Sequence, residues 1–154
     1  MDIKFETEGY KFNVRSSCII KDQKHQHVLL TYMKAITDHE AFLLPGGRLN
    51  LIENSREAIV REIEEELGIE LKYKLISIEE NISKETNFHM IEFVYYAEIE
   101  DFDMIETFDD GWDRFKVFSI DTIEKIDIRP KTVKRLIEQE TYENITHNIN
   151  YDWL

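Results

Sequence analysis

The chain has 154 residues, 42% of them hydrophobic, and a formal net charge of −13 from 32 acidic against 19 basic residues. This length and composition are typical of a globular chain with a sizeable core, and we expect one domain over residues 1–154, with its core at about 10–140 and a C-terminal tail at 141–154. A surface this acidic repels nucleic acid and anionic membranes, which disfavours a dedicated nucleic-acid-binding protein.

The cellular compartment follows from what the sequence lacks. No apolar run approaches the roughly 20 residues of a membrane span. The N-terminal residues are polar and acidic, unlike a secretory signal. Cys18, the only cysteine, cannot form an internal disulfide and lies in an apolar run, as a buried small hydrophobe would. We therefore expect a cytoplasmic protein.

The first third of the chain has the pattern of short strands. Residues 10–21 mix β-branched and aromatic residues with polar ones, and residues 27–33 form a second such run after the polar stretch 22–25. This arrangement predicts a hairpin. Residues 41–44 are a short apolar piece that ends at Pro45-Gly46-Gly47, a strong break in regular structure.

A helix is predicted over residues 55–67. Asn54 or Ser55 can cap its start, and Gly68 lies where a left-handed residue ends a helix. At about 100° per residue, one face of this helix is apolar. Its residues are Ile59, Val60, Ile63 and Leu67.

A second sector of the same helix carries Glu62, Glu65 and Glu66, while Glu64 points away from them into solvent. Like charges spaced four apart cost roughly 0.2–0.5 kcal/mol per pair. A divalent cation is the simplest compensation for that repulsion, so the sector is a candidate metal site.

The second half of the chain predicts more strands and one more helix. The run at 88–99 is apolar on both faces, so we expect it to be central in its sheet. The tail at 141–154 has no clear period. The other predicted segments are strands at 69–82 and 114–120, an acidic loop at 101–113 and a helix from Pro130 to about Glu140.

The stretch from Gly47 to Ile69, with Glu53 and the run Arg61-Glu-Ile-Glu-Glu-Glu-Leu-Gly, matches the Nudix box at every defined position. Phe42 before the glycine turn and the segment 118–130 followed by a helix also resemble this family, so the resemblance covers about residues 10–140. It implies an α/β fold, a Nudix-type α/β/α sandwich with a mixed central β-sheet. It also implies hydrolysis of a pyrophosphate bond in a nucleoside diphosphate linked to another group: a nucleotide, a nucleotide sugar or a dinucleotide.

The residues agree with that chemistry. Pyrophosphate hydrolysis needs charge neutralised on phosphate oxygens and a water made nucleophilic, and Mg²⁺ held by carboxylates can do both. We assign Glu65 and Glu66 as metal ligands, Glu62 as a ligand or the residue that orients the water, and, from the resemblance, the Gly46 carbonyl as a further ligand. Mn²⁺ can replace Mg²⁺ at such a site.

Other residues have supporting roles in this interpretation. The resemblance implies that Glu53 and Arg61 hold the loop and helix together by ion pairing, and Gly47 and Gly68 belong to the same framework. The acidic loop supplies Glu106 as the first candidate for the general base. Asp109 and Asp110 are alternatives, and the loop can equally be a solvated run of charges.

The substrate contacts are the least specific part of the pattern. Arg15 and Arg48 can hold phosphates, and Phe42 can stack on a base or belong to the core. We expect a small-molecule nucleotide as the partner, no membrane or nucleic acid, and a homodimer as one possible state because many relatives are dimers. Two alternative functions stay open: a catalytically silent nucleotide-binding or regulatory module, and an enzyme for capped or triphosphorylated RNA ends, which the net charge disfavours.

Overall fold

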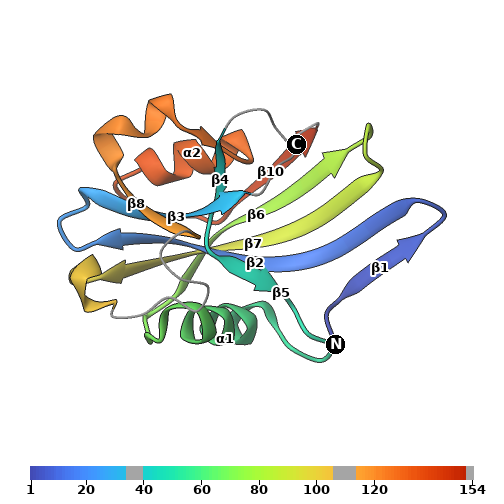
Figure 1. Ribbon diagram of the computed structural model, residues 1–154, viewed down its shortest axis with the longest axis horizontal. Helices are drawn as coiled ribbons and strands as arrows, with labels where there is room; N and C mark the ends of the chain where they lie inside the picture. The colour runs from blue at the N-terminus through green and yellow to red at the C-terminus, as the bar shows by residue number, and fades with distance from the viewer. Residues whose placement is uncertain (34–39, 106–113, 152–154) are drawn as a thin grey trace.

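A computed structural model describes residues 1–33, 40–105 and 114–151 of the chain. Its strands are β1 (Lys4–Thr7), β2 (Tyr10–Asp22), β3 (His27–Met33), β4 (Ala41–Leu43), β5 (Gly46–Arg48), β6 (Lys74–Ser83), β7 (Phe88–Ile99), β8 (Phe115–Ser119), β9 (Asp127–Ile128) and β10 (Thr146–Tyr151). Within the described ranges these strands form one curled sheet between helix α1 (Ser55–Leu67) and helix α2 (Lys131–Glu138) (Figure 1). Two 3₁₀ helices, η1 (Phe102–Met104) and η2 (Ile120–Lys125), complete the elements.

The sheet is mixed, as the predicted α/β/α sandwich requires. Its main order is β10-β6-β7-β2-β3-β4-β9. The pairs β2–β7, β6–β10 and β4–β9 are parallel, and the remaining pairs are antiparallel. The prediction that β7 is central is confirmed, because β7 lies between β6 and β2. The predicted β2–β3 hairpin is confirmed too, with Lys21 opposite Val28.

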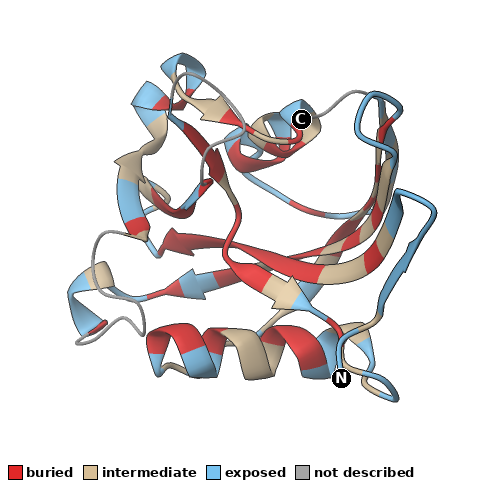
Figure 2. Cartoon of the chain, turned by 45° about the vertical axis from the view of Figure 1, so that its right-hand side comes forward, coloured by how far each residue is buried: buried red, intermediate tan, exposed pale blue. Residues whose placement is uncertain are grey.

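The core has two parts, one on each side of the sheet. Ile19 and Val94 pack with Val133 and Ile137 of α2, whereas Cys18 and Ile20 lie in a second cluster with α1. Figure 2 shows buried residues concentrated in the strands between the two helices, with exposed residues along the β1 end of the sheet. No helix in the described ranges is both long and apolar enough to cross a membrane.

Several elements differ from the sequence-based expectation. β6 begins at Lys74 rather than 69; the preceding Ile69, Leu71 and Tyr73 lie outside any strand and pack against the cluster under α1. Helix α2 ends at Glu138, and Pro130 is its N-cap residue.

The strand β10 was not predicted, and its exposure pattern explains why. The half-buried side chains of this strand are the polar ones, Thr146, Asn148 and Asn150. The exposed positions hold Ile149 and Tyr151. This is the reverse of the apolar-in, polar-out alternation by which a strand is recognised in a sequence.

Candidate active site

Helix α1 begins and ends where the sequence predicts. The Asn54 side chain accepts a hydrogen bond from the Glu57 backbone N–H at 2.9 Å, and the Glu57 carboxylate accepts one from the Asn54 N–H at 3.0 Å. This reciprocal pair is a capping box. At the other end Gly68 adopts φ +67° and donates its N–H to the Glu64 carbonyl at 2.9 Å.

Hydrogen bonds and apolar contacts fix α1 against the sheet. The Ser16 hydroxyl of β2 donates to the Ser55 carbonyl at 2.7 Å, and the Ser55 hydroxyl lies 2.7 Å from the Tyr95 hydroxyl of β7. Ile59, Ile63 and Leu67 are buried as predicted, together with Ala58 and Glu66.

Val60 differs from its predicted place in the apolar face. It is half-buried and lines a groove of about 760 Å³ along the outer side of α1. Glu64, exposed as expected, and Glu65 also line this groove. The apolar face of the helix is thus narrower than the sequence pattern suggests, and the opposite side of the helix carries the carboxylates of Glu64 and Glu65.

The glycine turn approaches both the sheet and the helix so closely that a side chain at either glycine would collide with a neighbouring group. Strand β5 pairs with β2, with Gly46 opposite Ser17 and Gly47 opposite Ser16. A Cβ atom on Gly46, whose φ is +150°, would lie 2.1 Å from the Ser16 carbonyl oxygen. A Cβ on Gly47 would lie 2.2 to 2.4 Å from the Glu62 carboxyl group. The Glu62 carboxylate therefore rests directly against the backbone of the turn.

Arg61 connects the loop before α1 to the acidic sector. Its guanidinium donates to both Glu53 carboxylate oxygens, at 2.7 and 3.0 Å, to Glu62 at 2.7 Å and to the Arg48 carbonyl at 3.0 Å. Glu65 is 3.4 Å away. The hydrogen bond from Arg61 is the largest influence on the pKa of Glu53, which lies below its ordinary value.

The three predicted metal-site carboxylates have different surroundings. The Glu65 side chain is 57% exposed, Glu62 is 15% exposed, and Glu66 is 7% exposed. The Glu66 carboxylate lies 3.0 Å from the guanidinium of Arg114, the residue just before β8. Arg114 was not predicted as a site residue, and its one signal in the sequence is its position directly after the acidic loop.

The chemistry of this donor set suits a hard divalent cation. Three carboxylates project from one sector of a rigid helix beside a backbone turn without side chains, and oxygen ligands of this kind are what Mg²⁺ and Mn²⁺ prefer. In the described ranges no three His, Cys, Asp or Glu side chains are gathered closely enough to form a complete metal cage. Arg61 and Arg114 instead neutralise Glu62 and Glu66.

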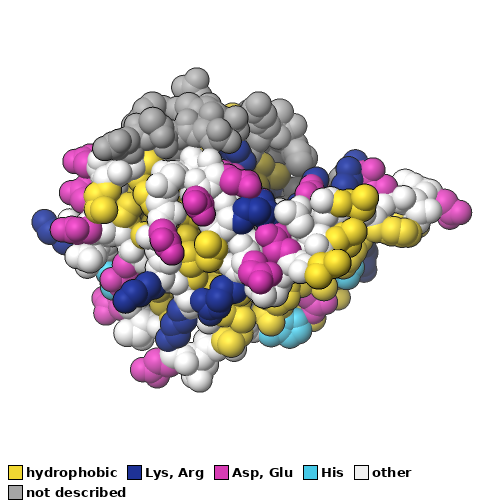
Figure 3. Space-filling view, turned by 90° about the horizontal axis from the view of Figure 1, so that it is seen from below, with side chains coloured by type: hydrophobic (Ala, Val, Ile, Leu, Met, Phe, Trp, Pro, Cys, Tyr) yellow, Lys and Arg dark blue, Asp and Glu magenta, His cyan; other side chains and the backbone are white. Residues whose placement is uncertain are grey.

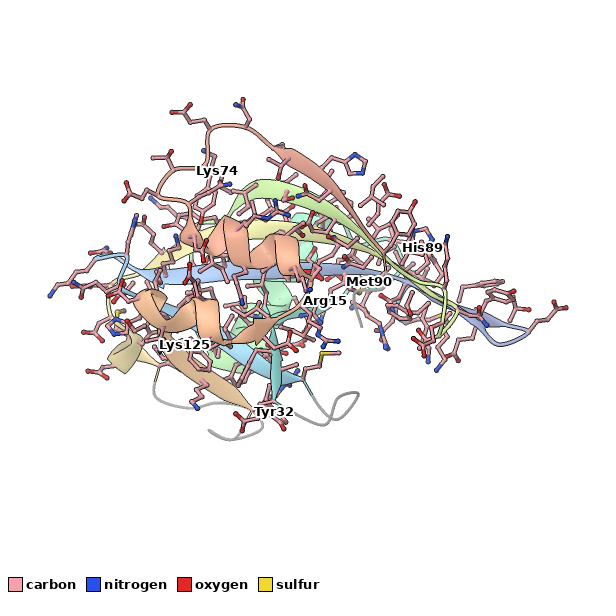
Figure 4. All side chains as sticks on the ribbon, turned by 90° about the horizontal axis from the view of Figure 1, so that it is seen from above. Arg15, Tyr32, Lys74, His89, Met90 and Lys125 are labelled. Atoms are coloured by element: carbon pink, nitrogen blue, oxygen red, sulfur yellow. The ribbon has the colours of Figure 1, made fainter. Side chains whose placement is uncertain are left out.

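Arg15 and Arg48, the predicted phosphate contacts, lie opposite each other on β2 and β5. Arg15 donates to the Leu44 carbonyl just before the glycine turn, at 2.5 Å, and its Nε is 3.8 Å from Glu92. Figure 4 shows Arg15 near the middle of the sheet, beside α2. Arg48 is 43% exposed, with Asp2 at 3.6 Å.

Phe42 lies in the core. Its ring is 4% exposed and packs edge-on against Phe118, with ring centroids 4.9 Å apart, and against Tyr32 at 5.7 Å. This burial agrees with the core interpretation of Phe42 rather than with stacking of its ring on a base.

Two buried carboxyl groups lie on the α2 side of the sheet, away from α1. Glu92 accepts a hydrogen bond from Ser17 at 2.8 Å, and Glu79 accepts from Ser77 at 3.2 Å and from Thr132 of α2. Burial raises the pKa of both groups above the ordinary value. Neither residue stands out in the sequence, since each occupies a polar position in an alternating strand.

The candidate general base Glu106 and its alternatives Asp109 and Asp110 lie outside the described residues.

The fold and the site together define the general class of this protein. A mixed sheet lies between two helices, and one of them, the acidic helix α1, rests on the glycine turn. The chain matches the family model described as NUDIX domain over residues 11–139. Because this match covers most of the sequence, the chain belongs to the Nudix hydrolase family.

Solved structures show the same fold. The MutT protein of Bacillus halodurans superposes with a TM-score of 0.67 at 20% identity, covering 92% of this chain and 93% of that one. The MutT NUDIX hydrolase of Burkholderia pseudomallei gives 0.63 at 24% identity, over 84% and 98%. NrtR of Shewanella oneidensis, solved in complex with a 27mer DNA, gives 0.64 at 15% identity, over 81% and 58%. At these identities the likeness concerns the fold.

One curated relative also matches in sequence. Over 64 residues the chain is 35% identical to cleavage and polyadenylation specificity factor subunit 5 of Dictyostelium discoideum. The match covers 42% of this chain and 30% of that protein, so it spans under a third of the relative's length.

Proposed function

We propose that the chain is an Mg²⁺-dependent enzyme that hydrolyses a pyrophosphate bond in a small substrate containing a nucleoside diphosphate. A nucleotide, a nucleotide sugar and a dinucleotide all fit that description. The observation that carries the proposal is the contact of the Glu62 carboxylate with the backbone of Gly47, on the helix sector that also bears Glu65 and Glu66. Family membership supports the reaction type.

Glu65, Glu66 and Glu62, with the Gly46 carbonyl, are the proposed ligands of Mg²⁺ or Mn²⁺. When bound, such an ion neutralises phosphate charge and lowers the pKa of a bound water. Arg61 holds Glu62 in place from its neighbouring position, and Glu53 in turn holds Arg61. We assign this pair, with Gly47 and Gly68, to structural support rather than to chemistry.

Arg15 and Arg48 are the proposed phosphate contacts. Both guanidinium groups belong to strands that meet at the glycine turn, and arginine suits phosphate because its planar donors fit two oxygens at once. Arg48 is the more exposed of the two, so it can move to a substrate at lower cost. Glu106 is the proposed general base.

A substrate panel tests the proposal directly. The purified chain with Mg²⁺ is incubated with nucleoside triphosphates, ADP-ribose and other nucleotide sugars, and dinucleoside polyphosphates, and the products are separated and identified. We expect phosphate-containing cleavage products from at least one member. Glu65→Gln and Glu66→Gln should lower turnover by at least about 100-fold, the scale of losing one group that stabilises the transition state.

Glu64→Gln is the matched control, since Glu64 lies on the same helix but is exposed and outside the proposed ligand set. Glu106→Gln tests the general base, and unchanged turnover would remove Glu106 from that role. A folded chain that binds Mg²⁺ and nucleotides in calorimetry but cleaves no panel member would refute the hydrolase proposal and favour a binding or regulatory module.

A further inference from the structure

The α1 side of the sheet is only partly covered. Even-numbered residues of β2 point to this side, because Cys18 and Ile20 pack with Ile59 and Ile63 of α1. Helix α1 covers the C-terminal half of β2. Among the described residues, no helix lies over the N-terminal half of β2 and the adjoining parts of β1, β7, β6 and β10 on this side (Figure 1). Figure 3, which views the molecule from the α1 side, shows hydrophobic side chains gathered over these strands beyond the helix.

Strand register gives the composition of this surface. One row across five strands consists of Phe5, Phe12, His89, Ile82 and Tyr151. The next row consists of Val14, Ile91, Glu80 and Ile149. We call these nine residues the open sheet face. Glu80 is its one Asp, Glu, Lys or Arg side chain, and His147 lies 2.7 Å from the Glu80 carboxylate.

The open sheet face exposes more apolar surface than a monomer usually does. Phe5 and Tyr151 are each 61% exposed, Ile149 is 52% exposed, and the neighbouring Tyr10 is 58% exposed. With the half-buried residues between them, these side chains present roughly 600–800 Å² of apolar area. A typical monomer exposes contiguous patches of at most about 300–600 Å², and a stable interface buries about 800 Å² per partner.

The edge next to this face is also unprotected. Among the described strands β10 pairs only with β6, so its other edge is free of strand partners. Its sequence, Thr146 to Tyr151, contains no Asp, Glu, Lys, Arg or Pro. Charged residues and proline are the usual means by which an edge strand avoids pairing with another chain.

We propose that the open sheet face is a homodimer interface, covered by the same face of a second copy of this chain across a two-fold axis. A two-fold contact places a surface against itself, which suits an apolar surface and penalises one of a single charge sign. A different partner recognising a chain of net charge −13 would be expected to use basic groups, and this face offers one carboxylate to meet them. Sheets packed face to face are a common way to bury two such surfaces.

Sedimentation equilibrium over a series of protein concentrations tests the interface. The wild-type chain should sediment with twice the monomer mass at micromolar concentration. Ile149→Asp should weaken dimerisation at least about tenfold, because it places an unpaired carboxylate in an apolar contact. Phe5→Asp, at the other end of the face, should weaken it in the same way.

Met104→Asp is the matched control, since Met104 is 54% exposed but lies on η1, outside the open sheet face, and it should leave the dimer unchanged. Circular dichroism and melting temperature establish whether each variant is folded. If Ile149→Asp does not fold, the Phe5→Asp variant decides the outcome. The dimer should tighten as salt rises, because salt screens the repulsion between two acidic chains. A wild-type chain that stays monomeric, or a dimer that both folded variants leave intact, would overturn the proposal.

Discussion

One guanidinium, that of Arg61, joins the loop before α1 to the acidic sector of the helix. Its side chain is 27% exposed and that of Glu53 is 13% exposed, so their bidentate pair lies between a surface ion pair and a buried one. We expect Arg61→Ala to lower the free energy of unfolding by about 1–3 kcal/mol, between the values typical of those two cases. Urea unfolding at pH 7 measures this change in the free energy of unfolding. The control is Arg135→Ala, on the exposed side of α2.

The ion pair between Glu53 and Arg61 also makes the stability of the fold depend on pH. Because Arg61 lowers the pKa of Glu53, the ionised carboxylate stabilises the fold at pH values above the ordinary glutamate pKa. That stabilisation is lost as pH falls through the lowered value. The difference in unfolding free energy between the wild type and Arg61→Ala should therefore shrink on going from pH 7 toward pH 3, and a constant difference would contradict this origin.

At this scale the sequence predicted contacts that are local and missed those that are not. Glu53, just before α1, and Arg61 on α1 are close along the chain, and their ion pairing was implied by the resemblance to the Nudix box. The Glu66–Arg114 contact joins a helix to the start of a strand far along the chain. Only the fold brings those two residues together, and spacing in the sequence carries no signal for it.

The unit formed by β5 and α1 depends on two glycines that differ in what they contact. A Cβ on Gly46 meets backbone, the Ser16 carbonyl and Ser17 Cα, which cannot move without disturbing β2. A Cβ on Gly47 meets the end of the Glu62 side chain, which can rotate away. Gly46→Ala should therefore destabilise the fold strongly, whereas Gly47→Ala should retain the fold and displace Glu62.

Thermal unfolding and Mg²⁺ titration calorimetry separate these two effects. Gly46→Ala should lower the melting temperature more than Gly47→Ala does, and Gly47→Ala should weaken Mg²⁺ binding while leaving the melting temperature closer to wild type. Gly9→Ala provides a comparison for a glycine of positive φ with no atom within 4 Å of the added Cβ. Equal destabilisation by Gly46→Ala and Gly9→Ala would mean that the positive φ the two glycines share, not the close approach at Gly46, dominates.

Elements with a complete local pattern were predictable, and elements that depend on their partners were not. Helix α1 has a capping residue, apolar residues at helical spacing and a terminating glycine, so its bounds followed from the sequence. Strand β5 consists of two glycines and an arginine, and it is a strand because β2 lies beside it. Strand β10 is recognisable only through its pairing with β6.

For the molecule as a whole, a net charge of −13 on one compact chain is a source of repulsion. Compact states with large net charge are destabilised by their own field, and salt screens it over about 10 Å at 0.1 M. We expect the melting temperature at pH 7 to rise as sodium chloride increases from about 10 to about 150 mM. An uncharged osmolyte at matched osmolality is the control, and a melting temperature that does not respond to salt would contradict the role of net charge.

Strand β2 pairs with β1, β3, β5 and β7, so it is shared by local and distant parts of the chain. Its pairings with β1 and β3 close over short loops, whereas its parallel pairing with β7 joins residues 10–22 to residues 88–99. Domains dominated by such distant contacts fold slowly, over about milliseconds to seconds. The glycine turn reaches its place only by pairing with β2, so during folding the acidic site should assemble after the sheet and serve as a late reporter of the native state.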